Sequence, residues 1–287
     1  MNKTNIIAEV GSSHMQDKGR ALELIAQAAA AGADTVKFQL FTASELWSRS
    51  DHRYRSAERV EMPAAWLPDL IDACAQNKVK FLCTPFSRSG VELLEYHQVE
   101  SYKVASGDLT YLPMLKSIAE TGKPVFLSVG GGAIAEINAA LNILAENEVV
   151  LMHCIADYPT APKDAYIRNI LNLGQMYTIG QNTIKRADIP VGLSSHLREW
   201  WVDAATVTYH VHSIEKHIDL ADRAGPEAGH SLDPVEFAAF VRAVRDIESA
   251  MAERPLADFE KFSKAELYGR ANWRRNPNTW LRPFNAR

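Results

Sequence analysis

The segment Asn5-Ile6-Ile7-Ala8-Glu9-Val10 is followed by an amphipathic stretch at Arg20–Ala31 and then by a second apolar run, Thr35-Val36-Lys37-Phe38-Gln39-Leu40. Both runs are short and apolar on both faces, which is typical of a parallel strand that is buried on two sides. Gly32 stands where the helical pattern ends, a common place for glycine. Together these segments predict a strand–helix–strand unit in which two parallel strands are joined by a helix.

This unit recurs along the rest of the chain. Further apolar runs lie at Val79–Thr84, Ser101–Ala105, Pro124–Val129, Val149–Cys154, Ile189–Ser194 and Ser213–Ile218. Helical patterns follow at Ala64–Asn77, Ser89–His97, Pro113–Thr121, Ile134–Glu146, Ile167–Tyr177, Glu199–His210 and Asp233–Ala252. Eight strands alternating with eight helices over about 250 residues predict an α/β protein with a (β/α)8 TIM barrel. The alternative, a doubly wound sheet, usually has fewer strands, and no Gly-x-Gly-x-x-Gly turn follows the first run.

The last helical pattern has the clearest start. Asp233-Pro234-Val235-Glu236 supplies a capping residue, a proline at the first helical position and the acid of a capping box. We expect the barrel to cover residues 1–254. Residues 255–287 are rich in arginine and short of apolar periodicity, so we expect a short C-terminal extension that forms no separate domain.

Composition narrows the class of protein. Of 287 residues, 47% are hydrophobic and 23% charged, which is ordinary for a globular protein. The 31 basic residues are outnumbered by 35 acidic ones, which argues against general nucleic-acid binding because no basic excess is available for phosphates. No apolar run reaches the ~18–20 residues needed to cross a bilayer. With three cysteines and no signal-peptide pattern at the N-terminus, we expect a cytoplasmic protein without membrane partners.

Polar residues gather where the predicted strands end, which is the catalytic face of a barrel. Lys37 and Lys103 lie inside runs too apolar for a sheet edge, so we expect them to meet an anion. Further donors follow neighbouring strands: the hydroxyls of Thr84, Ser106 and Ser128 and the N–H groups of Gly130–Gly132. This is the donor set that a ligand with a phosphate and a carboxylate requires.

Two histidines end neighbouring strands. His196 and His217 can approach within ligand distance of one divalent metal ion. Glu215 shares a face with His217, either as a ligand or as a residue that orients one. Glu9 and Asp108 are candidates for general acid–base catalysis, although Glu9 is equally suited to a fixed ion pair with a lysine. The long connection 41–63, which carries Trp47 and several arginines, is expected to lie over this face.

The motifs at these positions resemble the sialic acid synthases, in order, from about residue 5 to 245. They are Ile6-Ile7-Ala8-Glu9-Val10-Gly11, Lys37-Phe38-Gln39, Thr84-Pro85-Phe86, Lys103-Val104-Ala105-Ser106-Gly107-Asp108, His153-Cys154 with Tyr158-Pro159, Gly192-Leu193-Ser194-Ser195-His196, Ile214-Glu215-Lys216-His217 and Gly225-Pro226-Glu227. The resemblance implies a metal-dependent condensation of phosphoenolpyruvate with an open-chain aldose such as an N-acetylhexosamine. The products would be a 2-keto-3-deoxy sugar acid of the nonulosonic type and phosphate.

The resemblance also implies roles for single residues. Phosphoenolpyruvate would be bound by Lys37, Thr84, Lys103, Ser106, Ser128 and Ser194. The metal, Mn²⁺ with Mg²⁺ or Co²⁺ as alternatives, would be bound by His196 and His217. The sugar would meet Gln39, Tyr158 and Glu227, with Glu9, Asp108 and Tyr158 as the catalytic residues. Asp108 would handle a proton or the attacking water.

This sequence departs from the family pattern in three residues. The family usually has Glu where Asp108 stands, Asp where Glu227 stands and a small polar residue where Ala156 stands. Familiar members also continue into a small antifreeze-like domain that supplies an arginine to the sugar's acyl group. We expect a short member without that domain, a possible homo-oligomer, in which an arginine of the tail or of residues 49–59 takes over the contact.

Three alternatives stay open. A synthase of the 3-deoxy-octulosonate or heptulosonate phosphate type would use a phosphorylated sugar. A Schiff-base aldolase would use Lys103 or Lys37 as the amine. A non-catalytic barrel would bind a sugar acid without turning it over.

Overall fold

A computed structural model describes residues 3–178, 189–251 and 262–274. The chain divides into two compact units, Met1–Ser249 and Ala250–Arg287. The boundary expected at residue 254 lies outside the described residues, and so do Arg275, Arg282 and Arg287 of the tail. Within the second unit the structure describes one helix that the sequence analysis did not predict, α11 (Lys264–Trp273), which begins with a capping box between Ser263 and Glu266.

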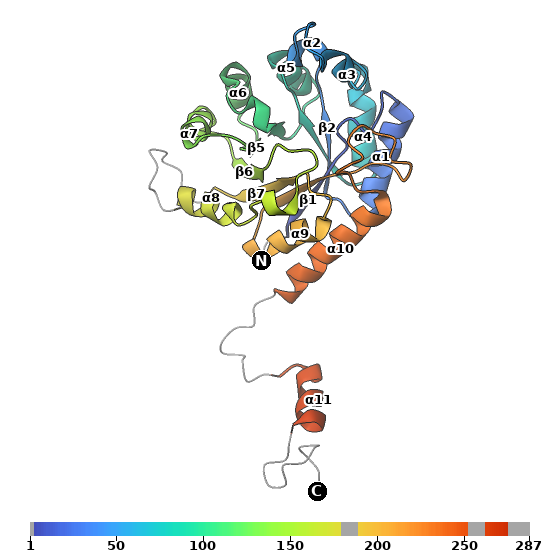
Figure 1. Cartoon of the computed structure of the whole chain (residues 1–287), viewed down its shortest axis with the longest axis vertical. Helices are drawn as coiled ribbons and strands as arrows, with labels where there is room; N and C mark the ends of the chain where they lie inside the picture. Colours follow the sequence, from blue (N-terminus) through green and yellow to red (C-terminus); the bar gives the residue numbers. More distant parts are fainter. Residues whose placement is uncertain (1–2, 179–188, 252–261, 275–287) are drawn as a thin grey trace. The chain divides into compact units, whose positions relative to one another are not determined.

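Eight parallel strands close into a barrel, which confirms the predicted fold (Figure 1). The strands are β1 (Asn5–Glu9), β2 (Thr35–Gln39), β3 (Lys80–Thr84), β4 (Tyr102–Val104), β5 (Val125–Ser128), β6 (Val149–Cys154), β7 (Val191–Ser195) and β8 (Ser213–His217). Each pairs with the next, and β1 pairs with β8 to complete the ring. The register sets Glu9 beside both Lys37 and His217.

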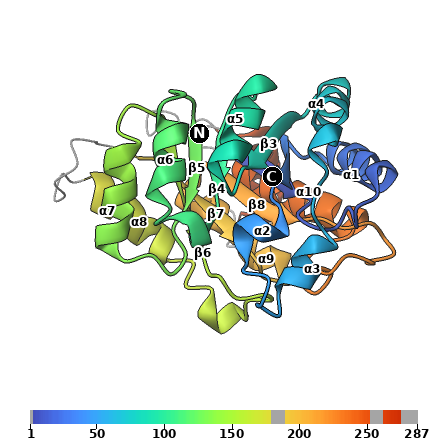
Figure 2. The same ribbon diagram turned by 90° about the horizontal axis from the view of Figure 1, so that it is seen from above.

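Helices follow the strands and surround the barrel (Figure 2). They are α1 (Lys18–Ala30), α4 (Leu67–Gln76), α5 (Arg88–Tyr96), α6 (Leu112–Ala119), α7 (Ile134–Ile143), α8 (Asn169–Thr178), α9 (Trp200–Ala205) and α10 (Pro234–Ala250). The predicted start of α10 is confirmed by a reciprocal pair of hydrogen bonds. The backbone N–H of Glu236 donates to the Asp233 carboxylate, and the backbone N–H of Asp233 donates to the Glu236 carboxylate. The predicted helix Glu199–His210 is wrong in its second half, which forms a 3₁₀ helix over Thr206–Tyr209.

The long connection after β2 is more ordered than the sequence suggested. It contains two short helices, α2 (Ala43–Leu46) and α3 (Tyr54–Glu58). Phe41, Ala43 and Ala57 form a small apolar cluster of their own, and Phe41 meets the ring of Phe86 edge-on. This cluster ties the connection to the segment after β3, so it positions α2 beside the barrel mouth.

The apolar core lies between the strands and the helices. Residues that point outward from the strands, such as Ile6 and Phe38, are fully buried, and Phe38 stacks on Phe81. One charged pair shares this layer: Lys216 of β8 and Asp203 of α9 lie 2.9 Å apart, and both side chains are completely buried. Inside the barrel, Gly192 allows Met152 to approach, since a Cβ there would lie 2.6 Å from the sulfur.

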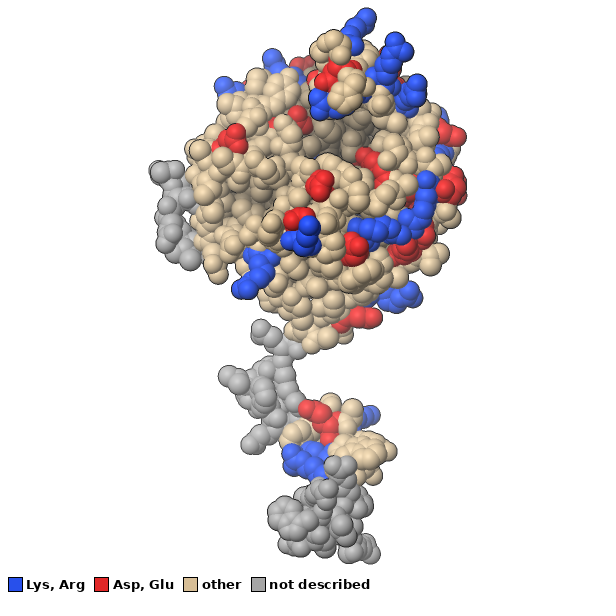
Figure 3. Space-filling model, in the orientation of Figure 1, with Lys and Arg blue, Asp and Glu red and all other residues tan. Residues whose placement is uncertain are grey.

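The surface carries charges of both signs. On the face seen in Figure 3, acidic and basic side chains are interspersed over the barrel. No helix within the described ranges combines the length and the apolar character that a membrane crossing requires.

Candidate active site

A cavity of about 620 Å³ opens at the carboxyl ends of the strands. It collects every residue to which the family resemblance gave a catalytic, substrate-binding or metal-binding role. These are Glu9, Lys37, Gln39, Thr84, Lys103, Ser106, Asp108, Ser128, Tyr158, Ser194, His196, His217 and Glu227. Their side chains come from all eight strands or from the segments that follow them, so barrel closure alone brings together positions that are up to 218 residues apart in sequence.

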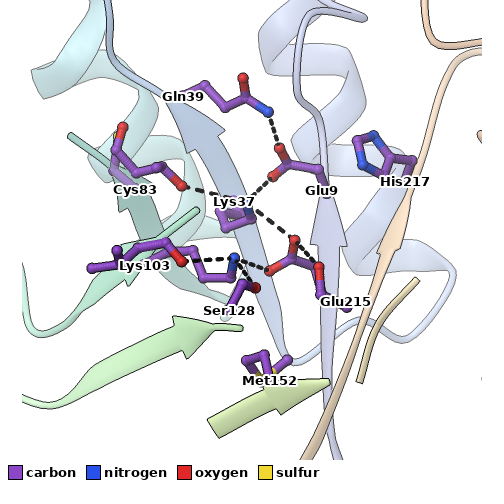
Figure 4. A network of polar contacts seen from close by, with 12 residues as sticks. Glu9, Lys37, Gln39, Cys83, Lys103, Ser128, Met152, Glu215 and His217 are labelled. Atoms are coloured by element: carbon purple, nitrogen blue, oxygen red, sulfur yellow. Dashed lines mark hydrogen bonds and ion pairs between the residues drawn. The ribbon is translucent and has the colours of Figure 1, made fainter. Parts of the chain in front are cut away.

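Two buried lysines and two buried glutamates form the floor of the cavity (Figure 4). The Lys37 ammonium lies 3.0 Å from Glu9 and 3.3 Å from Glu215. The Lys103 ammonium lies 3.7 Å from Glu215 and donates to the Ser128 hydroxyl at 2.7 Å. Glu215, which the sequence offered as a metal ligand or as a residue that orients one, lies between the two lysines.

The pKa values of the two glutamates and of Lys103 are shifted in different directions. Burial raises the pKa of Glu9, and Lys37 opposes that shift only in part. Burial acts on Glu215 in the same direction, but Lys103 and Lys37 together outweigh it and lower the pKa of Glu215. Burial lowers the pKa of Lys103 despite the attraction of Glu215. Glu215 is therefore the firm counter-ion of this floor, whereas burial favours the protonated form of Glu9.

Hydroxyl groups surround the lysines. Thr84 lies 3.4 Å from the Lys37 ammonium, and Ser194 donates to Glu215 at 3.0 Å. The Ser106 hydroxyl accepts from the backbone N–H of Gly130 at 3.0 Å, which ties the ends of β4 and β5 together. The predicted anion-binding side chains therefore line one cavity, whereas the N–H of Gly130, predicted as a further donor, is already bonded to Ser106.

Asp108 stands apart from this network. Its Oδ2 atom is buried without a hydrogen-bond partner among the described residues. Burial raises the pKa of Asp108 to about 6, with Lys103 opposing the shift. A carboxyl group poised near neutral pH at the edge of a cavity is suited to accept or donate a proton.

The two predicted histidines lie next to each other, with ring centres 5.4 Å apart. Burial and the neighbouring ring lower the pKa of His196 to about 4, and burial also lowers the pKa of His217 to about 4, so both imidazoles are neutral at pH 7. His196 Nδ1 lies 2.8 Å from the Ile155 carbonyl, which only accepts, so Nδ1 carries the proton and Nε2 holds the lone pair. His217 Nδ1 lies 3.2 Å from Glu227 Oε2, which fixes the same tautomer.

A third histidine, which the sequence analysis did not single out, joins this pair. His230 lies in the loop between β8 and α10, and its ring centre is 4.6 Å from that of His217. One signal was available in the sequence: the loops that follow barrel strands carry active-site residues, and His230 comes three residues after Glu227 in such a loop.

Apolar and aromatic side chains line the outer part of the cavity. Leu46 is the last residue of α2, Trp47 follows it directly, and Phe86 follows β3. Tyr158 lies over His196 with ring centres 4.1 Å apart. The Arg53 guanidinium covers the Trp47 ring at 3.6 Å.

The arginine expected to contact the sugar is not found at residues 49–59. Arg53 is bound to Asp51 at 2.8 Å, and within the described ranges no arginine of this segment lines the cavity. The tail arginine Arg270 stacks on Phe262 in the second unit.

Known proteins resemble this chain over most of its length. The N,N'-diacetyllegionaminic acid synthase of Campylobacter jejuni is 31% identical over 286 residues, which covers 93% of this chain and 81% of that protein. The pseudaminic acid synthase of the same organism is 28% identical, with 94% of this chain and 81% of that protein covered.

A solved structure agrees. The N-acetylneuraminic acid synthetase of Leptospira borgpetersenii, crystallised with citrate, matches with a TM-score of 0.83 at 27% identity, over 93% of this chain and 92% of that one. The NeuB family model matches residues 24–255. With the barrel, the cavity and this match together, the chain belongs to the NeuB family.

Proposed function

We propose that this protein condenses phosphoenolpyruvate with an open-chain N-acylated hexosamine, with the help of a divalent metal ion, to give a 2-keto-3-deoxy sugar acid and phosphate. The observation that carries the proposal is the cavity itself, in which two buried lysines lie opposite a group of neutral imidazoles. The names of its relatives, which are synthases of legionaminic, pseudaminic and N-acetylneuraminic acid, support it.

The lysine floor suits phosphoenolpyruvate. The charges of Lys37 and Lys103 are balanced by Glu9 and Glu215. The phosphate and carboxylate of an entering ligand would accept hydrogen bonds from the two lysines. The hydroxyls of Ser128 and Thr84, which already lie beside these lysines, would add further donors. These donors are held in place before the ligand arrives, so they stabilise its negative charges without reorganising.

The outer part of the cavity suits an acylated sugar. Gln39 and Tyr158 offer polar groups to hydroxyls, and the Leu46, Trp47 and Phe86 side chains offer an apolar wall. An acetamido methyl group gains from such a wall, whereas a sugar phosphate does not. This favours an unphosphorylated acceptor over the substrates of the octulosonate or heptulosonate phosphate type.

The imidazole group fits a divalent ion. His196 and His217 are neutral and each keeps an Nε2 lone pair, which is the form in which histidine binds metals. When bound, such an ion would polarise the aldehyde oxygen of the acceptor as a Lewis acid. The protein's part is to orient His217 through Glu227 and His196 through the Ile155 carbonyl.

Asp108 would move the proton. The methylene carbon of phosphoenolpyruvate forms a bond to the aldehyde carbon while the C=O π bond breaks, and water adds to C2. Asp108 takes one proton from that water, and this proton is delivered to the aldehyde oxygen, which becomes a hydroxyl. The bond from C2 to the phosphate oxygen then breaks, the remaining hydroxyl on C2 gives its proton to the departing phosphate, and C2 becomes a ketone. Because the pKa of Asp108 is raised by burial to about 6, the carboxylate form predominates at pH 7 and can take the proton of that water.

Phosphate release tests the proposal. The full chain is incubated with phosphoenolpyruvate and Mn²⁺ and with N-acetylmannosamine, diacetamido hexoses or phosphorylated aldoses, with and without EDTA. The proposal expects EDTA-sensitive release with an unphosphorylated N-acyl sugar, and loss of release in Lys103→Met but not in the surface control Lys80→Met. Release only with phosphorylated aldoses would contradict it, as would binding of phosphoenolpyruvate without release.

The aldolase alternative has its own readout. Lys103 has a lowered pKa because it is buried, and a neutral amine is what a Schiff base requires. Borohydride treatment with pyruvate would leave a covalent adduct on such an enzyme, and the proposal expects none.

A further inference from the structure

The β8–α10 loop, residues 218–233, brings Glu227 to the mouth of the cavity. The loop has an irregular backbone apart from one bridge between Ile218 and Leu232, which joins its two ends. That bridge fixes where the loop leaves the barrel and where it returns. It does not fix the place of Glu227 in between, so other contacts must hold that part of the loop.

Arg20 of α1 joins this loop to the neighbouring β1–α1 loop, residues 10–17. Its guanidinium donates to Asp219 at 2.5 Å and to the two carboxylate oxygens of Asp222 at 2.8 and 2.7 Å. Its Nε donates to the Ser13 carbonyl at 2.6 Å. The Arg20 side chain is 12% exposed and that of Asp219 is completely buried, so water screens this ion pair little. One guanidinium thus holds groups of two loops in a forked geometry that a lysine cannot supply.

Asp219 carries the contact on to the segment that holds Glu227. Its Oδ2 atom accepts from the backbone N–H of Gly225 at 2.9 Å, two residues before Glu227. A Cβ at Gly225 would lie 2.9 Å from this oxygen and 2.9 Å from the Cα atom of Ser13, so the absence of a side chain lets the two loops meet. Arg20, Asp219 and the Gly225 backbone therefore form a continuous path from α1 to Glu227.

The β1–α1 loop receives the Glu227 carboxylate. The backbone N–H of Ser12 donates to Glu227 Oε2 at 3.2 Å, and a Cβ at Gly11 would lie 2.1 Å from the same oxygen. This oxygen is also 3.2 Å from His217 Nδ1. With so little free space, the place of the carboxylate depends on how the two loops lie against each other.

We propose that Arg20 is a positioning residue for the acceptor sugar, because it fixes the β8–α10 loop against the β1–α1 loop and so sets the place of the Glu227 carboxylate. The inference rests on the proposed function, in which Glu227 meets the sugar. Within the described part of the chain, the lining of the cavity does not include Arg20, so Arg20 acts through Glu227. The residues assigned to phosphoenolpyruvate lie on β2 to β5 and β7 or directly after them, so the effect falls on the sugar.

The first test compares Arg20→Met with the matched control Arg245→Met. Arg245 of α10 makes the same kinds of bond at the amino-terminal end of β1, to the carboxylates of Asp34 and Glu248 and to the Thr4 carbonyl. Both variants should lose stability. Only Arg20→Met should lower kcat/KM for the N-acyl hexosamine that supports phosphate release, by about 10–100-fold, since a displacement of about 1 Å far from the chemistry can cost about 100-fold.

The affinity of Arg20→Met for phosphoenolpyruvate, measured by calorimetry, should equal that of the unmodified protein. Arg20→Lys keeps the charge without the fork, so its kcat/KM should lie between the two. The inference is overturned if Arg20→Met keeps the unmodified kcat/KM, if Arg245→Met loses as much, or if the affinity for phosphoenolpyruvate falls in parallel.

A double-mutant cycle tests whether Arg20 acts through Glu227. The same Arg20→Met change should reduce kcat/KM strongly in the unmodified protein and little in Glu227→Ala, because residues that act through one another are not additive. Equal reductions in the two backgrounds would show that Arg20 acts by another route and would overturn the inference.

Hydrogen exchange followed by mass spectrometry gives a readout that needs no activity, and it decides if Glu227→Ala is too slow to measure. Peptides from residues 219–231 should exchange faster in Arg20→Met than in the unmodified protein and in Arg245→Met, and equal exchange would overturn the inference. Should Arg20→Met not fold, as judged by circular dichroism, Asp222→Ala takes its place with the same but smaller changes, since it removes the exposed carboxylate and leaves Asp219 paired. If the loop exchanges faster in Arg20→Met but no sugar supports phosphate release by the unmodified protein, the anchoring by Arg20 stands and the proposed function fails.

Discussion

Asp108 provides a quantitative test, because the same burial that would make it a useful base also destabilises the folded protein. Its pKa rises from the ordinary 3.8 to about 6 in the folded chain. At about 1.4 kcal/mol for each pH unit, the difference corresponds to about 3 kcal/mol. The sign follows from linkage: the folded state binds this proton more tightly, so stability is lost as the pH rises from about 4 to about 6.

Asp108→Asn removes the charge and keeps the shape of the side chain. The variant should therefore be more stable than the unmodified protein by up to about 3 kcal/mol at pH 8, by about half of that at pH 5, and by little near pH 4. Urea unfolding at several pH values measures this difference. Asp72→Asn, which removes an exposed carboxylate from α4, is the control and should show no comparable gain.

The turnover of Asp108→Asn should fall, although its stability rises. Removal of a general base costs about 10²–10⁴ in turnover. The acidic limb of kcat/KM near pH 6 should also disappear in Asp108→Asn. A variant that is no more stable at pH 8, or that gains the same amount at every pH, would refute the account of this carboxyl group.

Three further predictions concern the rest of the site. Lys103→Met should weaken phosphoenolpyruvate binding by about 10–100-fold in calorimetry, the equivalent of about 1.5–3 kcal/mol for hydrogen bonds to a charged group, and an unchanged affinity would contradict the lysine floor. Gly11→Ala should displace Glu227, since the new Cβ would fall 2.1 Å from its oxygen, and weaker Mn²⁺ binding is the expected readout. Lys216→Met should destabilise the fold by about 3–5 kcal/mol in urea unfolding, because it leaves the buried Asp203 charge unpaired, and adding Asp203→Leu should restore most of the loss.

The periodic part of the sequence predicted the fold well. Runs that are apolar on both faces became the eight strands, and every side chain to which the family resemblance gave a role lines one cavity. The alternation of side chains along β8 also placed Glu215 and His217 on one face, and both line the cavity. The two-residue alternation of side chains does not reveal which residue each side chain contacts. The ion pairs of Glu215 with both lysines and of Lys216 with Asp203 are therefore seen only in the structure.

The connecting segments were predicted less well. Helices α2 and α3 are four and five residues long, too short for a periodic signal, and they are held by the cluster around Phe41. His230 lies in a loop whose backbone returns to the barrel mouth through a turn at Glu227, and sequence spacing does not reveal that return. These two segments flank the acceptor side of the cavity, where the sequence analysis expected an arginine that residues 49–59 do not supply.

Carbon NMR of the reaction with [3-¹³C]phosphoenolpyruvate tests the central claim most directly. With the full chain, Mn²⁺ and an N-acyl hexosamine, the account predicts that the labelled vinyl carbon becomes the methylene of a 2-keto-3-deoxy acid, with one phosphate released for each product and none without the sugar. Conversion of the label to the methyl group of pyruvate, or phosphate release that does not depend on the sugar, would contradict carbon–carbon bond formation in this cavity.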